Sequence, residues 1–155
     1  MSRIPRLQEN LKTGFTAEAV SASRYRAFAR KADEDGHPNL AQRWLRLAAA
    51  KDRLAIDLLV AAEQVWGEDA DLGLAISEER YENDVLYPKI IRDDEQGRLK
   101  TIFEPVVEAQ RQHLRDLEAL RLELNGSQGD VKPPSEEKSI AKSPTGTAQA
   151  AAAGS

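Results

Sequence analysis

Residues 39–66, NLAQRWLRLAAAKDRLAIDLLVAAEQVW, contain apolar side chains that recur at spacings of three and four along almost the whole segment. This period is that of one face of an α-helix and not that of a β-strand. Asn39 is a good N-cap and Gly67 directly follows Trp66, so we expect a helix between Asn39 and Trp66. Its inward-facing stripe comprises Leu40, Trp44, Leu47, Lys51, Leu54, Leu58, Ala61 and Val65.

The same period appears on both sides of this segment. We expect further helices over about residues 5–34, 71–95 and 98–124, with Pro88 kinking the third of them. A C-cap signal at residues 125–126 closes the last helix. The connections are short, and short connections place consecutive long helices antiparallel. The sequence therefore predicts an all-α protein, built as an antiparallel up-down-up-down four-helix bundle.

The composition changes after residue 126. Residues 1–126 are rich in Ala, Leu, Arg and Glu, which favour helices, and they form the predicted bundle domain. From Ser127 onward the chain consists mainly of Gly, Pro, Ser, Lys, Thr and Ala and offers almost nothing to bury. We therefore expect residues 127–155 to be a disordered tail.

The composition also excludes several classes of protein. The 155 residues include no cysteine, which excludes a disulfide scaffold and a rubredoxin-type iron centre. No apolar run approaches the roughly 20 residues of a membrane span, and the N-terminus lacks a signal-peptide core. The net charge of −4 comes from interspersed acidic and basic residues, which gives no indication of nucleic-acid binding. We expect a cytoplasmic protein with neither a membrane nor a nucleic acid as partner.

Polar residues interrupt the apolar stripes near the middle of every helix. These residues are Glu18, Lys51, Glu79, Glu82, Gln110 and His113. An antiparallel bundle brings the middles of its helices to one level, and a buried charge is costly unless it is paired or bound to a metal ion. The coincidence predicts a shared central polar site. Taken singly, Lys51 could instead lie at the edge of its stripe and reach water, and His113 could be an ordinary buried histidine.

Longer stretches carry a family pattern. They are Glu9-Asn10-Leu11, Glu18 and Arg24-Tyr25 in the first helix, residues 36–41 in the first turn, and Glu79-Arg80-Tyr81-Glu82 with Tyr87-Pro88 in the third helix. These stretches resemble the rubrerythrin family of the ferritin-like superfamily, and the resemblance covers about residues 6–122. It implies a ferritin-like four-helix bundle, a site for two iron ions and a homodimer.

The residues at the implied metal site depart from the family pattern. Four ligand positions of the family are matched here by Glu18, Glu79, Glu82 and His113. The Glu-x-x-His motif of the second helix is replaced by Lys51 and Leu54, and a carboxylate of the fourth helix is replaced by Gln110. Two iron ions need several carboxylates to neutralise and bridge them, so we do not expect an intact diiron centre.

Two states of this site remain open. Either there is no cofactor, or one divalent metal ion, iron foremost, is held by the residual ligands. In the metal-free state Lys51 takes the place of a metal ion and compensates the negative charges of the carboxylates, and Gln110 takes the place of a ligand. The resemblance implies three tyrosines as neighbours of the site: Tyr25, Tyr81 and Tyr87.

Three functions are compatible with these features. The first is a scaffold-like, non-catalytic protein that is metal-free or binds a single metal ion. The second is an iron-dependent oxidoreductase, a peroxidase or an oxidase, with an altered ligand set. The third is a dimeric interaction module that docks onto a larger assembly through its tail at residues 127–155. The sequence assigns no catalytic residue.

Overall fold

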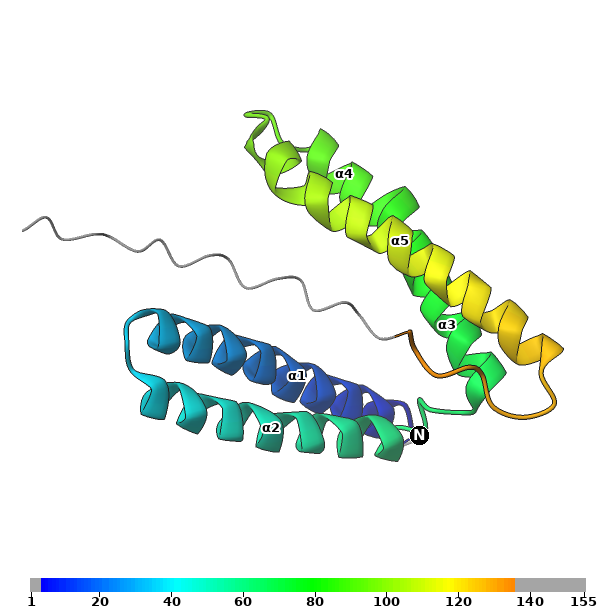
Figure 1. Cartoon of the computed structure of the whole chain (residues 1–155), viewed down its shortest axis with the longest axis horizontal. Coiled ribbons are helices and arrows are strands. Elements are labelled where there is room, and N and C mark those ends of the chain that lie inside the picture. Colours follow the sequence, from blue (N-terminus) through cyan, green and yellow to red (C-terminus); the bar gives the residue numbers. More distant parts are fainter. Residues whose placement is uncertain (1–3, 136–155) are drawn as a thin grey trace, which may run out of the picture.

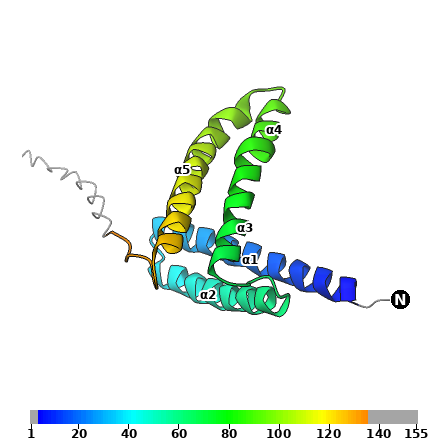
Figure 2. The same cartoon turned by 90° about the vertical axis from the view of Figure 1, so that its right-hand side faces the viewer.

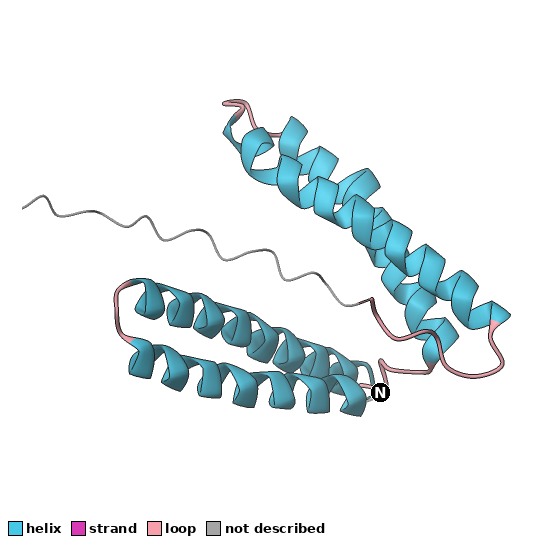
Figure 3. Ribbon diagram, viewed as in Figure 1, coloured by secondary structure: helices cyan, strands magenta, loops and turns pink. Residues whose placement is uncertain are grey.

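The computed structural model describes residues 4–135, and within them the protein is all-α (Figures 1 and 3). Its elements in chain order are α1 (Ile4–Glu34), α2 (Pro38–Ala61), α3 (Glu68–Tyr81), the π-helical segment η1 (Glu82–Leu86), α4 (Tyr87–Arg92) and α5 (Arg98–Gly126). The predicted class, with four helical segments in antiparallel contact, is confirmed. We call α1 and α2 hairpin 1, and α3, η1, α4 and α5 hairpin 2.

Hairpin 1 is held together by a seam of alanines. Four buried alanines recur every seven residues along α2 and its C-cap: Ala41, Ala48, Ala55 and Ala62. From α1, Ala22, Ala29 and Ala32 are buried as well. A side chain of one methyl group lets two helix backbones approach closely, so α1 and α2 pack closely along this seam. Near the turn, Trp44 stacks on Phe28 and Tyr25, with ring centroids 5.1 Å apart in both pairs.

The boundaries of α2 differ from those expected. The N-cap is His37 and not Asn39, because Pro38 occupies the first helical turn, where its fixed φ suits the helix and its missing N–H is not needed. The helix ends at Ala61 and not at Trp66. Glu63 adopts a φ of 55°, a left-handed conformation that stops the helix before the remaining apolar residues.

Hairpin 2 is built around a break in its first arm. Pro88 has no N–H to donate, and the helix widens into the π-helical segment just before it, with the Tyr87 N–H bonded to the Glu82 carbonyl five residues back. The expected kink at Pro88 is therefore a π-helical turn, and the arm ends at Arg92. Ile76 and Asn83 are the buried residues of this arm and face α5.

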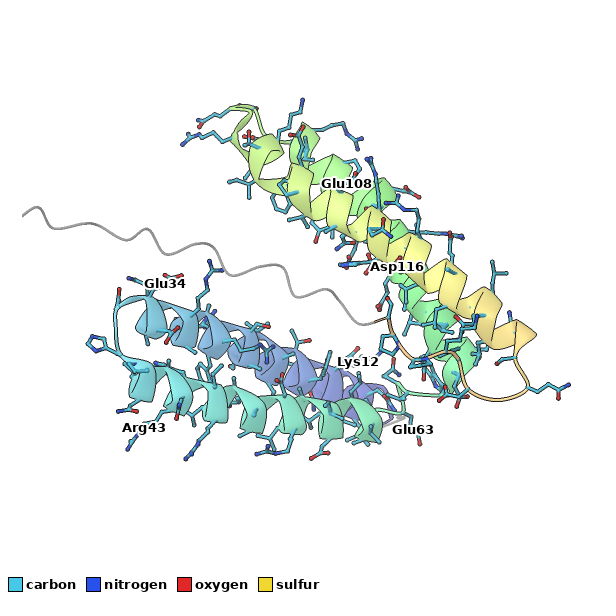
Figure 4. The ribbon with its side chains drawn as sticks, in the orientation of Figure 1. Lys12, Glu34, Arg43, Glu63, Glu108 and Asp116 are labelled. Atoms are coloured by element: carbon cyan, nitrogen blue, oxygen red, sulfur yellow. The ribbon has the colours of Figure 1, made fainter. Side chains whose placement is uncertain are left out.

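Charged residues cover the outside of both hairpins. Figure 4 shows the side chains of Lys12, Glu34 and Arg43 on hairpin 1 and those of Glu108 and Asp116 on hairpin 2, all of them exposed. Ion pairs also bridge the exposed edges of each hairpin, between Arg26 and Asp52 at 2.5 Å, and between Arg121 and Asp69 at 3.0 Å. Such exposed pairs add little stability and mainly fix which way each helix faces.

The two hairpins lie apart. Among the described residues, no helix of hairpin 1 has a Cα within 8 Å of any helix of hairpin 2. Figures 1 and 2 show them running in different directions from the linker that joins α2 to α3. The expected closure of all four helices around one centre is thus not made within a single chain.

Residues 127–135 follow α5 without regular secondary structure. The Lys132 N–H donates to the Glu123 carboxylate at 2.6 Å, and Val131 lines a pocket at the end of hairpin 2 together with Leu72 and Leu124. The rest of the predicted tail, residues 136–155, lies outside the described residues. None of the helices among residues 4–135 is long and apolar enough to cross a membrane.

Candidate functional site

Hairpin 1 supplies one half of the predicted polar site, an ion pair across its seam. The Lys51 Nζ of α2 lies 2.8 Å from the Glu18 Oε2 of α1, with 31% and 24% of the two side chains exposed. Hydrogen bonding to Glu18 is the largest effect on the lysine and holds the pKa of Lys51 above its ordinary value of 10.5, while desolvation opposes it in part. The negative charges of Glu18 and of Tyr25 when ionised act in the same direction as the hydrogen bond. Lys51 is therefore a protonated ammonium group at neutral pH.

Hairpin 2 supplies the other half. His113 Nδ1 of α5 lies 3.9 Å from Glu79 Oε1 of α3, and this glutamate is largely shielded while the histidine is 60% exposed. One turn away, Gln110 Nε2 donates to the Tyr87 hydroxyl at 3.5 Å. The π-helical segment begins at Glu82, whose half-buried side chain makes no polar contact with another described side chain.

Several polar atoms of hairpin 2 are buried without a hydrogen-bond partner among the described residues. They are Glu79 Oε2, Gln110 Oε1 and both side-chain amide atoms of Asn83. A buried polar group without a partner costs about 1–3 kcal/mol. Hairpin 2 therefore carries acceptors that no residue in the described part of the chain satisfies.

The structure brings the predicted site residues together only in pairs. Glu18 meets Lys51, Glu79 meets His113, and the two pairs belong to hairpins that do not touch. Tyr87 contacts Gln110, as expected of a neighbour of the site. Tyr81 is 56% exposed.

The residues present do not fit the paired-iron centre that the resemblance implies. Lys51 stands at a position where the family has a ligating carboxylate. Its ammonium group pairs with Glu18, whose carboxylate oxygen a metal ion would need as a ligand. Leu54 offers no donor atom, and the amide of Gln110 carries no charge to neutralise a cation. Within residues 4–135, no three His, Asp or Glu side chains come together as a metal site would require.

Two features of the site were not expected from the sequence. The first is Asn83, which the sequence analysis did not single out and which is only 6% exposed, within the π-helical segment that precedes Pro88. The second is the exposure of the stripe leucines, of which Leu40, Leu47 and Leu54 are each about half exposed. Only a packing partner would have covered them, and periodicity does not say where that partner comes from.

Comparison with known proteins adds no relative. No protein-family model matches the chain, and no curated protein matches it either. The resemblance to rubrerythrins accordingly rests on the sequence stretches quoted above alone.

Proposed function

We propose that this protein is a non-catalytic helical scaffold of the rubrerythrin-like type, in which a lysine takes the place of metal in the central site. The observation that carries the proposal is the 2.8 Å ion pair between Lys51 and Glu18. An ammonium group at this place neutralises the carboxylate that an iron ion would otherwise bind, and it repels any cation brought next to it.

Charge balance supports a scaffold over a redox enzyme. An iron-dependent peroxidase or oxidase needs a donor set that holds iron through changes of oxidation state, and carboxylates supply most of the necessary negative charge. In this chain Lys51 and Gln110 replace two carboxylate ligands of the family, and Leu54 replaces a histidine ligand. The iron-dependent oxidoreductase is thus the weaker alternative, and docking through the tail at residues 127–155 remains a prediction from the sequence.

A second candidate is a scaffold that holds one divalent cation on hairpin 2. The approach of Glu79 to His113 favours it, together with the unpartnered Glu79 Oε2. Carboxylate and imidazole donors suit iron, zinc or manganese. Such a site would not involve Lys51, which lies on the other hairpin.

Metal analysis tests these candidates. The full-length protein is purified from iron-supplemented cells, and its metal content is measured by mass spectrometry beside a Glu79→Gln variant. Well below one equivalent of metal in both proteins is the expected result. One equivalent that Glu79→Gln abolishes would establish the single-cation scaffold. Two irons per chain with peroxide turnover would overturn the proposal in favour of the oxidoreductase.

A further inference from the structure

Hairpin 1 presents an apolar face that nothing covers. Leu40, Leu47 and Leu54 recur every seven residues along α2, so they lie in one row beside the alanine seam, with 47%, 51% and 50% of each residue exposed. On α1, Leu7 and Phe28 are also exposed, at 59% and 42%. We call this surface open face 1.

Hairpin 2 presents a matching face. Along α5, Ile102, Val106 and Leu120 are exposed on the side that also carries His113. We call this surface open face 2. It is apolar towards both ends and polar at its middle, where Glu79 lies beside His113. Open face 1 likewise has a polar middle, formed by Lys51 and Glu18.

The single chain lacks a core of ordinary size. Its buried hydrophobic residues among the described part are seven alanines and Ile76, and no large side chain there is fully buried. A chain of 155 residues normally buries enough apolar surface to form a proper core. Here the side chains suited to a core are on the two open faces, and apolar patches of this extent mark interaction surfaces.

The middles of the two faces are complementary in hydrogen bonding. Open face 1 offers the Lys51 ammonium, which has three N–H donors and one carboxylate contact. Open face 2 offers Glu79 with an unpartnered oxygen, and the carboxylate of Glu82 without a partner among the described side chains. Open face 1 thus offers N–H donors to acceptors that open face 2 leaves without a partner among the described residues.

The linker holds the two faces of one chain away from each other. The Asp71 carboxylate accepts hydrogen bonds from the backbone N–H groups of Trp66 at 3.0 Å and Gly67 at 3.2 Å. At the other end of the linker, Gln64 Nε2 donates to the Ala62 carbonyl at 3.2 Å. These bonds order the linker locally, and the tail is a poor alternative cover because Ile140 is the one large apolar residue after residue 135.

We propose that a second copy of the chain covers these faces by reciprocal exchange of hairpins. Open face 1 of each protomer packs on open face 2 of its partner, which closes two four-helix units related by a two-fold axis. Each unit contains one central polar layer, with Glu18 and Lys51 from one protomer and Glu79, Glu82, Gln110 and His113 from its partner. The exchange does not depend on whether the layer holds a metal ion.

The first test compares two leucines that the single chain exposes equally. Leu47 is 51% exposed on open face 1, whereas Leu45, two residues away on the opposite side of α2, is 49% exposed. Light scattering should give twice the chain mass of 17.2 kDa for the wild type. Leu47→Glu should give the mass of one chain, and Leu45→Glu should leave the dimer intact. A monomeric wild type, or equal dissociation by both variants, would overturn the proposal.

The second test asks which chain supplies each hairpin. Leu54 and Leu120 both lie about two helical turns from the linker-side ends of their helices, so the exchange brings them to one level. The chain has no cysteine, so Leu54→Cys and Leu120→Cys can be made in separate chains, refolded together and treated with a short bis-maleimide. Covalent heterodimers are expected. If the Leu54→Cys/Leu120→Cys double variant instead forms only internally linked monomers, the hairpins close within one chain and the proposal fails.

A truncation after residue 135 controls for the tail. The truncated chain should remain a dimer and give the same cross-linked heterodimers. Loss of the dimer on truncation would show that residues 136–155 are needed for dimerisation, and it would overturn the proposed exchange of hairpins.

Discussion

Lys51 Nζ lies 2.8 Å from Glu18 Oε2, so the cation of α2 and the carboxylate of α1 neutralise each other across the seam of hairpin 1. Neither side chain is deeply buried, and both remain on the face that the second hairpin of a four-helix unit would cover. The pair therefore serves as the fixed, charged centre of an otherwise apolar surface.

Stability should depend on this pair in alkaline solution. The pKa of Lys51 is raised in the folded protein, so folding favours the protonated amine. Its stabilising contribution is fully present below the unfolded pKa of about 10.5 and is lost as the pH rises through the higher folded pKa. Thermal unfolding of the wild type and of Lys51→Met should therefore differ at neutral pH and converge in strongly alkaline solution. A constant difference across this range would show that Lys51 contributes through packing and not through charge.

Restoring the missing ligands should restore metal binding. Lys51→Glu with Leu54→His rebuilds the second-helix motif, and Gln110→Glu adds the fourth-helix carboxylate. We expect iron per chain, measured by mass spectrometry, to rise several-fold in the double variant and further in the triple variant. A triple variant without iron would place the defect in the backbone geometry of the layer.

The same variant provides a control on the exchange of hairpins. Adding Leu47→Glu should remove the iron by separating the two halves of the layer, whereas adding Leu45→Glu should not. Iron retained in the Leu47→Glu background would mean that one hairpin holds the metal alone.

The alanine seam should tolerate no larger side chain. Ala48 is 2% exposed between α1 and α2, and a leucine there would force the helices apart at a cost of about 1–3 kcal/mol in the free energy of unfolding. The adjacent Ala49 is exposed, and Ala49→Leu should change that free energy by less than about 0.5 kcal/mol. Urea denaturation measures both. Equal effects would contradict the assignment of Ala48 to the helix–helix contact.

The π-helical segment contains a residue whose replacement should stabilise the protein. Asn83 is 6% exposed with both amide atoms unpartnered, and Leu has a similar volume without the polar group. Asn83→Leu should raise the free energy of unfolding by about 1 kcal/mol, since the cost of the unpaired amide disappears. Asn10→Leu, at an exposed position of α1, is the matched control and should have little effect. A loss of stability in Asn83→Leu would reveal a hydrogen-bonding partner for the amide.

The helices themselves could be predicted from the sequence because their period of 3.6 residues is strong. Their ends and their interruption were harder to predict. Trp66 continues the apolar pattern of α2, yet the left-handed Glu63 ends the helix earlier, and a single backbone conformation leaves no trace in periodicity. Pro88 indicated where the helix would be irregular but not how, because a kink and a π-helical turn both accommodate the missing N–H of proline.

The candidate site could be predicted as a set of residues but not as an assembly. Glu18, Lys51, Glu79 and His113 were found because each interrupts an apolar stripe, and the structure pairs them within each hairpin. Whether the stripes of hairpins 1 and 2 meet depends on the direction the chain takes after residue 61. That direction is set by hydrogen bonds such as those of Asp71, which are local and have no signature at the level of composition.

If hairpins are exchanged between chains as proposed, the division of the polar residues between two hairpins also bears on inheritance. A chain damaged at Lys51 and a chain damaged at His113 would each be defective alone. Mixed in one cell, they would assemble one layer with both lesions and one layer with neither. Two faulty gene copies could thus complement each other, and a single faulty copy would impair layers that contain normal partners.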